Sequence, residues 1–194
     1  MIYTKRVEEA INLAIQAHET DKKQKRKGKD IPYIVHPLSV GMIIAKAGGD
    51  EDVVIAGILH DTIEDSAEEK KITKEIIKEK FGENIMELVL SVTEEEKDAP
   101  WEDRKAQALA HIEHFSNDSV LLKSADVVSN VTEIYLDYQT TGDKTFDRFN
   151  AKKEKTLENY SNVARALLRK WTESPLADDL KNILENLEEM REIK

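Results

Sequence analysis

Apolar residues recur every three or four positions along most of the chain. In residues 4–19, for example, Val7, Ile11 and Ala14 follow this spacing, which is the period of an amphipathic helix. No segment keeps the strict alternation of apolar and polar residues that is typical of a half-buried strand. The pattern therefore predicts an all-α fold, a compact multi-helix bundle.

Prolines and glycines mark the ends of the predicted helices. Pro37 suits the first turn of a helix that ends at Gly48 and Gly49, and Gly82 ends another helix. Asp50 is a suitable N-cap for the helix that follows it. Together these signals predict helices over residues 4–19, 37–47, 73–81, 83–93, 101–115, 117–137 and 147–171, and one that starts after Asp50.

The last residues of the chain read as a separate amphipathic helix. Pro175 marks a boundary before it. We therefore predict one domain over residues 1–172 and an acidic helical tail over residues 173–194. The apolar stripe of the tail could fold back on the domain or meet another subunit. This stripe consists of Leu180, Ile183, Leu184, Leu187 and Met190.

Composition narrows the classes of protein that fit. A chain of 194 residues fits one ordinary domain. It has no cysteine, which excludes disulfides, thiolate zinc sites and cysteine nucleophiles and is compatible with a reducing compartment. A net charge of −10 and a pI near 5.1 argue against binding to nucleic acid or to an anionic membrane. No apolar stretch approaches the ~20 residues of a membrane span, so we expect a cytoplasmic protein.

The stretch GILHDTIEDS, residues 57–66, ends an apolar run in a group of ionisable side chains. On a continuous helix His60 would share a face with Glu64, and Asp61 with Glu64 and Asp65. Carbonyl groups at a helix C-terminus also favour a cation. A divalent metal would neutralise this cluster, and mixed imidazole and carboxylate ligands suit manganese, iron, zinc or magnesium more than calcium. The alternative is a charged helix end with no ligand.

Two further residues bear on the metal hypothesis. His36 lies between apolar residues directly before Pro37, so its ring is placed at the start of a helix. Asp126 lies on a segment that is apolar enough to be buried, and a buried aspartate is costly unless it is paired or bound to metal. Lys123 and Asn130 share its helix face. A salt bridge between Lys123 and Asp126 is therefore the alternative to a metal role.

The order of these motifs resembles that of the HD-superfamily phosphohydrolases. HPL at 36–38 is followed by ILHD at 58–61, ED at 64–65 and KSAD at 123–126. The longer runs AHETDKKQKRKGKDIPYIVHPLSV, HDTIEDS and EIIKEKFGENIMELVLSVT are similar to the hydrolase domain of RelA/SpoT proteins and of stand-alone small alarmone hydrolases. HD alone is a weak signal, whereas the ordered set is specific. The resemblance extends over residues 5–170.

The resemblance implies a metal centre with a pair of catalytic carboxylates. Glu64 and Asp65 match the pair that orients and deprotonates the attacking water, and a divalent metal acidifies that water and draws charge from the phosphoryl group. The ion in this family is usually manganese, although another divalent ion remains open. His18 matches a histidine expected to pack or to form hydrogen bonds around the site. The matched metal ligands are His36, His60, Asp61 and Asp126.

The resemblance also implies contacts with a phosphorylated substrate. Arg26 most nearly matches an arginine that meets substrate phosphate, with Lys25 or Lys27 as substitutes in the same loop. The alternative for this basic loop, Lys22–Lys29, is a solvated charge run. The other matched or neighbouring candidates for substrate binding are Arg104, Lys105, Lys123 and Asn130. For Arg104 and Lys105 the alternative is surface ion pairing with Glu102 or Glu113.

The activity that the resemblance implies is hydrolysis of (p)ppGpp, the nucleotide of the stringent response, with release of its 3′-diphosphate as pyrophosphate. One departure concerns the substrate: the relatives read DRLHN after the metal aspartate, whereas this chain reads DVVSN at 126–130. Another nucleotide or NADPH is therefore an alternative substrate, and a non-catalytic nucleotide-binding module is an alternative function. The expected partner is a small phosphorylated nucleotide, not a nucleic acid or a membrane, and a homo-oligomer is left open.

Overall fold

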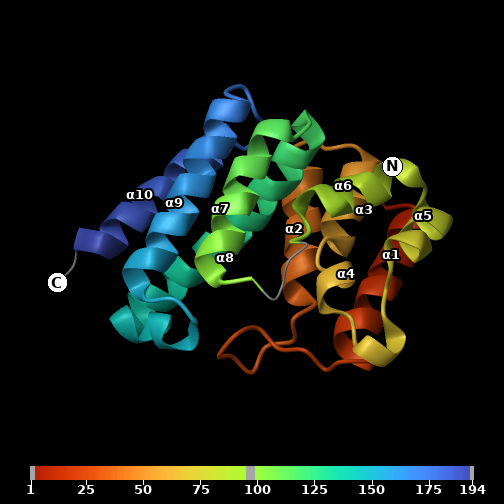
Figure 1. Cartoon of the computed structure of the whole chain (residues 1–194), viewed down its shortest axis with the longest axis horizontal. Helices are drawn as coiled ribbons and strands as arrows, with labels where there is room; N and C mark the ends of the chain where they lie inside the picture. Colours follow the sequence, from red (N-terminus) through yellow and green to blue (C-terminus); the bar gives the residue numbers. More distant parts are fainter. Residues whose placement is uncertain (1–2, 95–98, 193–194) are drawn as a thin grey trace. The chain divides into compact units, whose positions relative to one another are not determined.

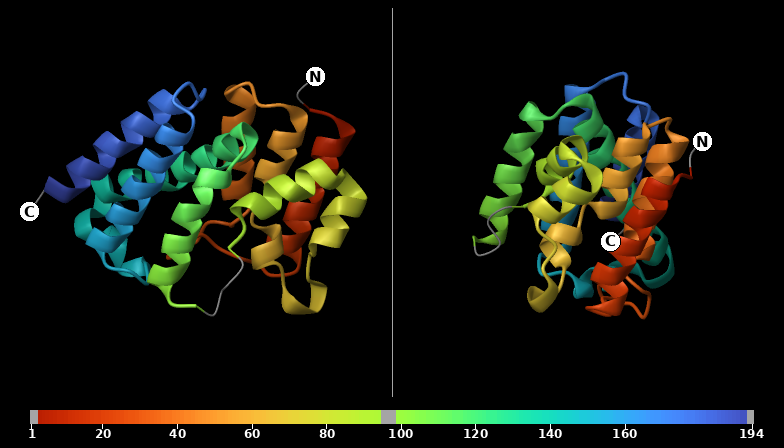
Figure 2. Two further views of the ribbon diagram at one scale, coloured as in Figure 1. Left: turned by 45° about the horizontal axis from the view of Figure 1, so that its top comes forward. Right: turned by 90° about the vertical axis from the view of Figure 1, so that its right-hand side faces the viewer.

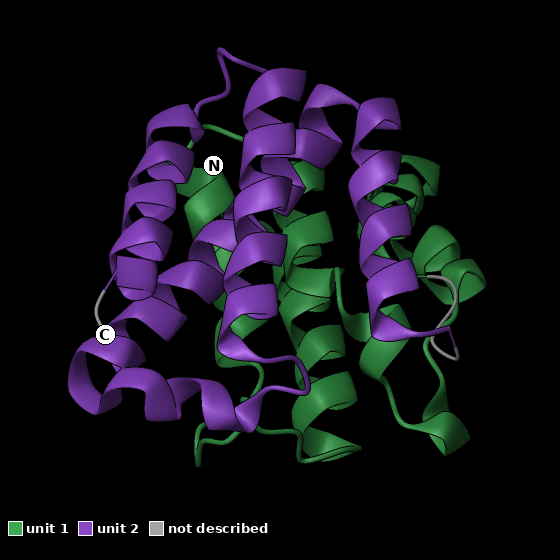
Figure 3. Cartoon of the chain, turned by 60° about the vertical axis from the view of Figure 1, so that its left-hand side comes forward, with its two compact units in different colours: residues 1–98 green, residues 99–194 purple. Residues whose placement is uncertain are grey.

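Helices form the regular structure of residues 3–94 and 99–192, the parts of the chain that the computed structural model describes (Figure 1). Apart from one isolated bridge between Lys25 and Pro32, these residues form no β structure. The predicted all-α class is confirmed. The chain divides into two compact units, residues 1–98 and 99–194 (Figure 3). None of the helices in the described ranges has the length and apolar character needed to cross a bilayer.

The first unit is built around a short helix, α3 (Glu51–Leu59), which is buried except for its first two residues. Every residue from Val53 to Leu59 is buried, because α1 (Lys5–Ile15), α2 (Val35–Lys46) and α6 (Glu83–Val92) pack against α3. The remaining elements are the π-helical turn η1 (Gln16–Thr20), α4 (Thr62–Asp65), the 3₁₀ turn η2 (Glu68–Lys70) and α5 (Lys74–Phe81).

Two glycines allow α2 and α3 to approach closely, and the helices run side by side in Figures 1 and 2. A Cβ atom on Gly41 would lie 2.7 Å from Cγ1 of Ile58, and one on Gly57 would lie 2.5 Å from Cδ1 of Ile44. Both isoleucines are buried, so neither has open space to move into. The close contact places the start of α2 and the end of α3 next to each other.

Gly41→Ala is therefore expected to destabilise the protein by about 1–3 kcal/mol, the usual range for overpacking a core. The added methyl group meets an inner carbon of Ile58, not the tip of its side chain. The free energy of unfolding from urea titration measures the effect. Met42→Ala is the matched control, because Met42 is the next residue on the same helix and is 67% exposed. Equal stability of the two variants would contradict the close-packing argument.

The second unit is organised around the long helix α8 (Asn117–Thr141), with α9 (Lys153–Lys170) and α10 (Ala177–Glu192) packed against it. α10 lies within the predicted tail, residues 173–194. In the predicted apolar stripe Leu184 is half-buried, and the other members, Leu180, Ile183, Leu187 and Met190, are buried. The tail therefore folds back within this unit. The boundary between residues 172 and 173 stays a prediction. The other elements are α7 (Trp101–His111), η3 (Ile112–His114) and η4 (Gly142–Arg148).

Several helix ends differ from the predicted ones. The segment predicted as one helix over 147–171 is helical from Lys153, and residues 142–148 form a separate 3₁₀ turn. The first helix changes to a π-helical turn after Ile15. The spacing of apolar residues identifies the buried face of a helix, but it does not reveal where a local turn replaces the α-helical hydrogen bonds.

Candidate functional site

The predicted single helix through His60 and Asp61 is wrong, because the chain breaks between α3 and α4 at these two residues. His60 follows the last residue of α3 and Asp61 precedes the first residue of α4. Nδ1 of His60 donates to the carbonyl of Gly57 at 2.8 Å, and Oγ1 of Thr62 donates to the carbonyl of Leu59 at 2.7 Å. These side chains occupy carbonyls that the next helical turn would use, which interrupts the helix.

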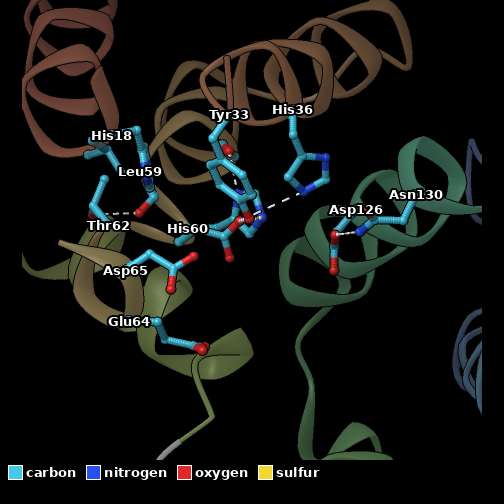
Figure 4. Close-up of polar contacts among 12 residues, drawn as sticks. His18, Tyr33, His36, Leu59, His60, Thr62, Glu64, Asp65, Asp126 and Asn130 are labelled. Carbon is cyan, nitrogen blue, oxygen red and sulfur yellow. Dashed lines mark hydrogen bonds and ion pairs between the residues drawn. The ribbon is translucent and has the colours of Figure 1, made fainter. Parts of the chain in front are cut away.

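Two imidazoles and one carboxylate meet at this break in the first unit (Figure 4). His36 comes from the first turn of α2, and its ring centre lies 5.2 Å from that of His60. Oδ2 of Asp61 lies 3.1 Å from Nε2 of His60 and 3.8 Å from Nε2 of His36. Both histidines are buried, with exposures of 3% and 4%. The structure thus brings three of the four predicted ligands together within one unit.

The orientation of the His60 ring shows that this group suits a cation. Because Nδ1 donates to the Gly57 carbonyl, it carries a proton, and Nε2 is the ring nitrogen that faces Oδ2 of Asp61. At 3.1 Å, Nε2 of His60 and the carboxylate oxygen of Asp61 lie close enough together for one positive charge to bind to both atoms. A histidine held through Nδ1–H by a main-chain carbonyl is also the usual arrangement for a metal ligand. The donor set therefore fits a divalent metal.

Sequence reasoning missed Tyr33, which contacts one of these ligands directly. Its hydroxyl donates to Oδ2 of Asp61. Burial and then the charge of Asp61 raise the pKa of Tyr33 far above its usual range, so the phenol stays a neutral donor. The guanidinium of Arg26 lies 5.5 Å from the centre of the Tyr33 ring, within cation–π distance. Tyr33 thereby connects the basic loop to the imidazole and carboxylate cluster.

The predicted catalytic pair lies on α4, and each carboxylate is held by a segment distant in sequence. Oε1 of Glu64 accepts from the main-chain N–H of Glu94 at 2.7 Å. Oδ2 of Asp65 accepts from Nε2 of Gln24 at 2.9 Å, and its main-chain carbonyl accepts from Nζ of Lys22 at 2.6 Å. Both side chains are partly exposed. They are fixed in direction and remain reachable by a small molecule.

Asp126 lies in the second unit, on α8, and is 9% exposed. Nζ of Lys123 donates to its Oδ2 at 2.8 Å and Nδ2 of Asn130 donates to its Oδ1 at 2.6 Å. The predicted grouping of acid, amide and ammonium on one helix face is confirmed (Figure 4 shows the amide and the acid). The salt bridge considered as an alternative for Asp126 is present. Its role as a metal ligand stays a prediction.

The other predicted cationic contacts differ in their surroundings. In the basic loop Lys25 pairs with Asp30, while Lys27 is exposed. Arg104 and Lys105 lie half-buried on α7 in the second unit. Glu102, one of the acids considered as their partner, pairs with Lys155 at 2.5 Å. The assignment of these cations to the substrate stays a prediction.

Comparison with known proteins places the chain in a family. Residues 10–167 match the HD domain. The sequence is 36% identical over 129 residues to guanosine-3′,5′-bis(diphosphate) 3′-pyrophosphohydrolase MESH1 of Xenopus tropicalis, covering 65% of this chain and 68% of that protein. It is 29% identical over 170 residues to the bifunctional (p)ppGpp synthase/hydrolase SpoT of Escherichia coli, covering 84% of this chain and 22% of SpoT. A solved metazoan ortholog of SpoT, 22% identical, shares the fold with a TM-score of 0.77 over 95% of this chain and 97% of that chain. The chain therefore belongs to the HD domain family.

Proposed function

We propose that this protein is a divalent-metal-dependent hydrolase that releases pyrophosphate from the 3′ position of (p)ppGpp. One observation carries the proposal: the buried side chains of His36 and His60 gather with the partly exposed carboxylate of Asp61 in a chain that is 36% identical to a 3′-pyrophosphohydrolase of this nucleotide. The carboxylate pair on α4, which directly follows Asp61 in the chain, favours an enzyme over a binding module, because a positioned carboxylate can act as a general base. The cytoplasm is the proposed place of action.

The proposed metal ligands are Nε2 of His36, Nε2 of His60 and the carboxylates of Asp61 and Asp126. Mn²⁺ is the proposed ion, because the ion in the family that the sequence resembles is usually manganese, and mixed nitrogen and oxygen ligands are compatible with it. When bound, a divalent ion would lower the pKa of water well below its bulk value and would draw charge from phosphoryl oxygens. Tyr33 supports this role by holding Asp61, and Gly57 supports it by orienting the ring of His60.

Glu64 and Asp65 are the proposed catalytic residues. Each is a carboxylate with one oxygen fixed by a hydrogen bond, to Glu94 or to Gln24. A carboxylate with a fixed direction can hold a water molecule and accept its proton as the oxygen attacks phosphorus. A lone pair of the water oxygen forms the new O–P bond, and the electron pair of the broken P–O3′ bond leaves with the ribose 3′ oxygen. That oxygen takes a proton from solvent, which gives the 3′-hydroxyl of GDP or GTP, and the phosphoryl product is pyrophosphate.

Cations from both units are the proposed contacts for substrate phosphate and nucleotide. Arg26 is the best supported, because its guanidinium lies over the ring of Tyr33 and Tyr33 binds the ligand Asp61. In a protein of net charge −10, an anionic substrate requires such local positive charge. The full set comprises Arg26, Lys27, Arg104, Lys105, Lys123 and Asn130.

The direct test incubates the purified protein with Mn²⁺ and ppGpp and measures pyrophosphate and GDP. We expect the two products in equal amounts, and little activity after the metal is removed by a chelator. NADPH and GTP in the same assay test the alternative substrates raised by the DVVSN sequence at 126–130. Hydrolysis of NADPH or GTP without release of pyrophosphate from ppGpp would reject the substrate and keep the metal chemistry. No hydrolysis of any of them would reject the enzyme.

A further inference from the structure

A chain of hydrogen bonds leads from the buried interior of the first unit to Asp65. Nδ1 of His18 lies 2.9 Å from Oε1 of Gln24, and Nε2 of Gln24 donates to Oδ2 of Asp65 at 2.9 Å. His18 is fully buried, with an exposure of 0%, whereas Asp65 is partly exposed. The amide of Gln24 thus joins an interior imidazole to a proposed catalytic carboxylate.

The main chain of Gln24 is fixed on both sides. Its N–H donates to the carbonyl of His18 at 2.7 Å, and its carbonyl accepts from the N–H of Tyr33 at 2.9 Å. The basic loop is therefore anchored at Gln24 in spite of its exposed lysines. Because the main chain of Gln24 is fixed, the position of its Cβ atom is defined. The amide group at the end of the side chain needs one further contact to fix its rotation.

His18 supplies that contact and also determines the direction of the amide. Among the described residues Nε2 of His18 has no hydrogen-bond partner, although it is buried. A buried N–H donor without an acceptor is more costly than an unused acceptor, so the proton belongs on Nδ1. Burial lowers the pKa of His18, which keeps the ring neutral. Nδ1–H then donates to Oε1 of Gln24, which leaves Nε2 of the amide to face the carboxylate.

We propose that Gln24 is a positioning residue for the hydrolysis, and that His18 fixes the orientation of its amide. If the amide were reversed, its oxygen would face Oδ2 of Asp65 and repel it. With the orientation fixed, Asp65 points in one direction and can hold the attacking water in a productive place. The proposal rests on the proposed function, since it assigns Asp65 to the reaction.

The first test compares Gln24→Leu with the wild type in the ppGpp assay. We expect kcat to fall by about 10–100-fold, the usual effect of removing a residue that orients a reacting group, while KM and bound metal change little. Gln16→Leu is the matched control, because Gln16 lies exposed on the same η1 turn as His18. A rise in KM alone, or loss of metal, would overturn a positioning role. An inactive wild type would instead reject the proposed function.

Variants of His18 test whether it acts through Gln24. His18→Asn keeps a donor near the position of Nδ1 and is expected to retain most of kcat, whereas His18→Leu is expected to lose as much as Gln24→Leu. The double variant His18→Leu/Gln24→Leu should be no slower than Gln24→Leu, because both changes break one chain. Additive losses would overturn the connection. Thermal unfolding of each variant identifies losses that come from instability.

The orientation of the Gln24 amide can be tested without the activity assay. Nitrogen-15 NMR of labelled protein distinguishes a ring protonated at Nδ1 from one protonated at Nε2. We expect His18 to be neutral with its proton on Nδ1 between pH 6 and 8, in the wild type and in Asp65→Asn. A proton on Nε2 would require the amide of Gln24 to reverse, and would overturn the proposal even if the enzyme hydrolyses ppGpp.

Discussion

Replacing Asp61 with alanine is expected to remove the divalent ion and to lower the rate of pyrophosphate release by about 10³-fold or more. Oδ2 of Asp61 lies 3.1 Å from Nε2 of His60 and 3.8 Å from Nε2 of His36, so the carboxylate supplies negative charge next to the two rings. Without the carboxylate of Asp61, the first unit contributes two imidazoles to the proposed site and no negative charge to balance the divalent ion. Without the metal, the pKa of the attacking water rises toward its ordinary value. Each unit of this rise reduces the hydroxide available at neutral pH tenfold.

Metal content by mass spectrometry, after loading with Mn²⁺ and dialysis, measures the first effect, and the ppGpp assay measures the second. Asp61→Asn is made in parallel because it keeps an oxygen acceptor for the hydroxyl of Tyr33, so a loss of metal in both variants does not come from an unpaired phenol. Glu68→Gln removes an exposed carboxylate from the same unit and serves as the control. Normal metal content and activity in Asp61→Ala would show that the ligands are misassigned.

The fold could be predicted from the sequence where the spacing of apolar residues alone determines the structure. The helical period of apolar residues predicts the buried faces of α8 and α10, because burial of an apolar stripe determines how such helices pack. The spacing of apolar residues does not predict the break at His60 and Asp61, because the break depends on side-chain hydrogen bonds to the carbonyls of Gly57 and Leu59. Periodicity carries no information about such local competition for carbonyl groups.

The candidate site could also be predicted only in part from the sequence. The grouping of His36 with His60 and Asp61 follows from the motif order, and the structure shows it within the first unit. Tyr33 and Gln24 were not selected, because a glutamine in the basic loop and a tyrosine shortly after it have no charge pattern that points to distant partners. Their contacts join segments about 30 to 40 residues apart, and only the folded chain determines them.

The second large effect is expected when either carboxylate of the pair Glu64 and Asp65 is replaced by an amide: kcat falls while the metal stays bound. Glu64→Gln and Asp65→Asn should each lower kcat by about 10²–10⁴-fold, the usual contribution of a positioned general base. This corresponds to about 3–5 kcal/mol of transition-state stabilisation. Each amide keeps an oxygen that can accept the existing hydrogen bond, from Glu94 N–H or from the amide of Gln24. The substitutions therefore remove charge and proton affinity while they preserve shape.

The pair of variants distinguishes a catalytic role from a role in binding. If Glu64 and Asp65 act on the attacking water, kcat falls while KM for ppGpp and the Mn²⁺ content stay near the wild-type values. If they are metal ligands instead, metal content falls in step with activity, as expected for Asp61→Ala. Glu94→Gln is the matched control, because Glu94 contacts Glu64 through its main-chain N–H, which this substitution leaves in place. Full activity in both Glu64→Gln and Asp65→Asn would leave the water without a base on α4 and would move the search for the proton acceptor to another element.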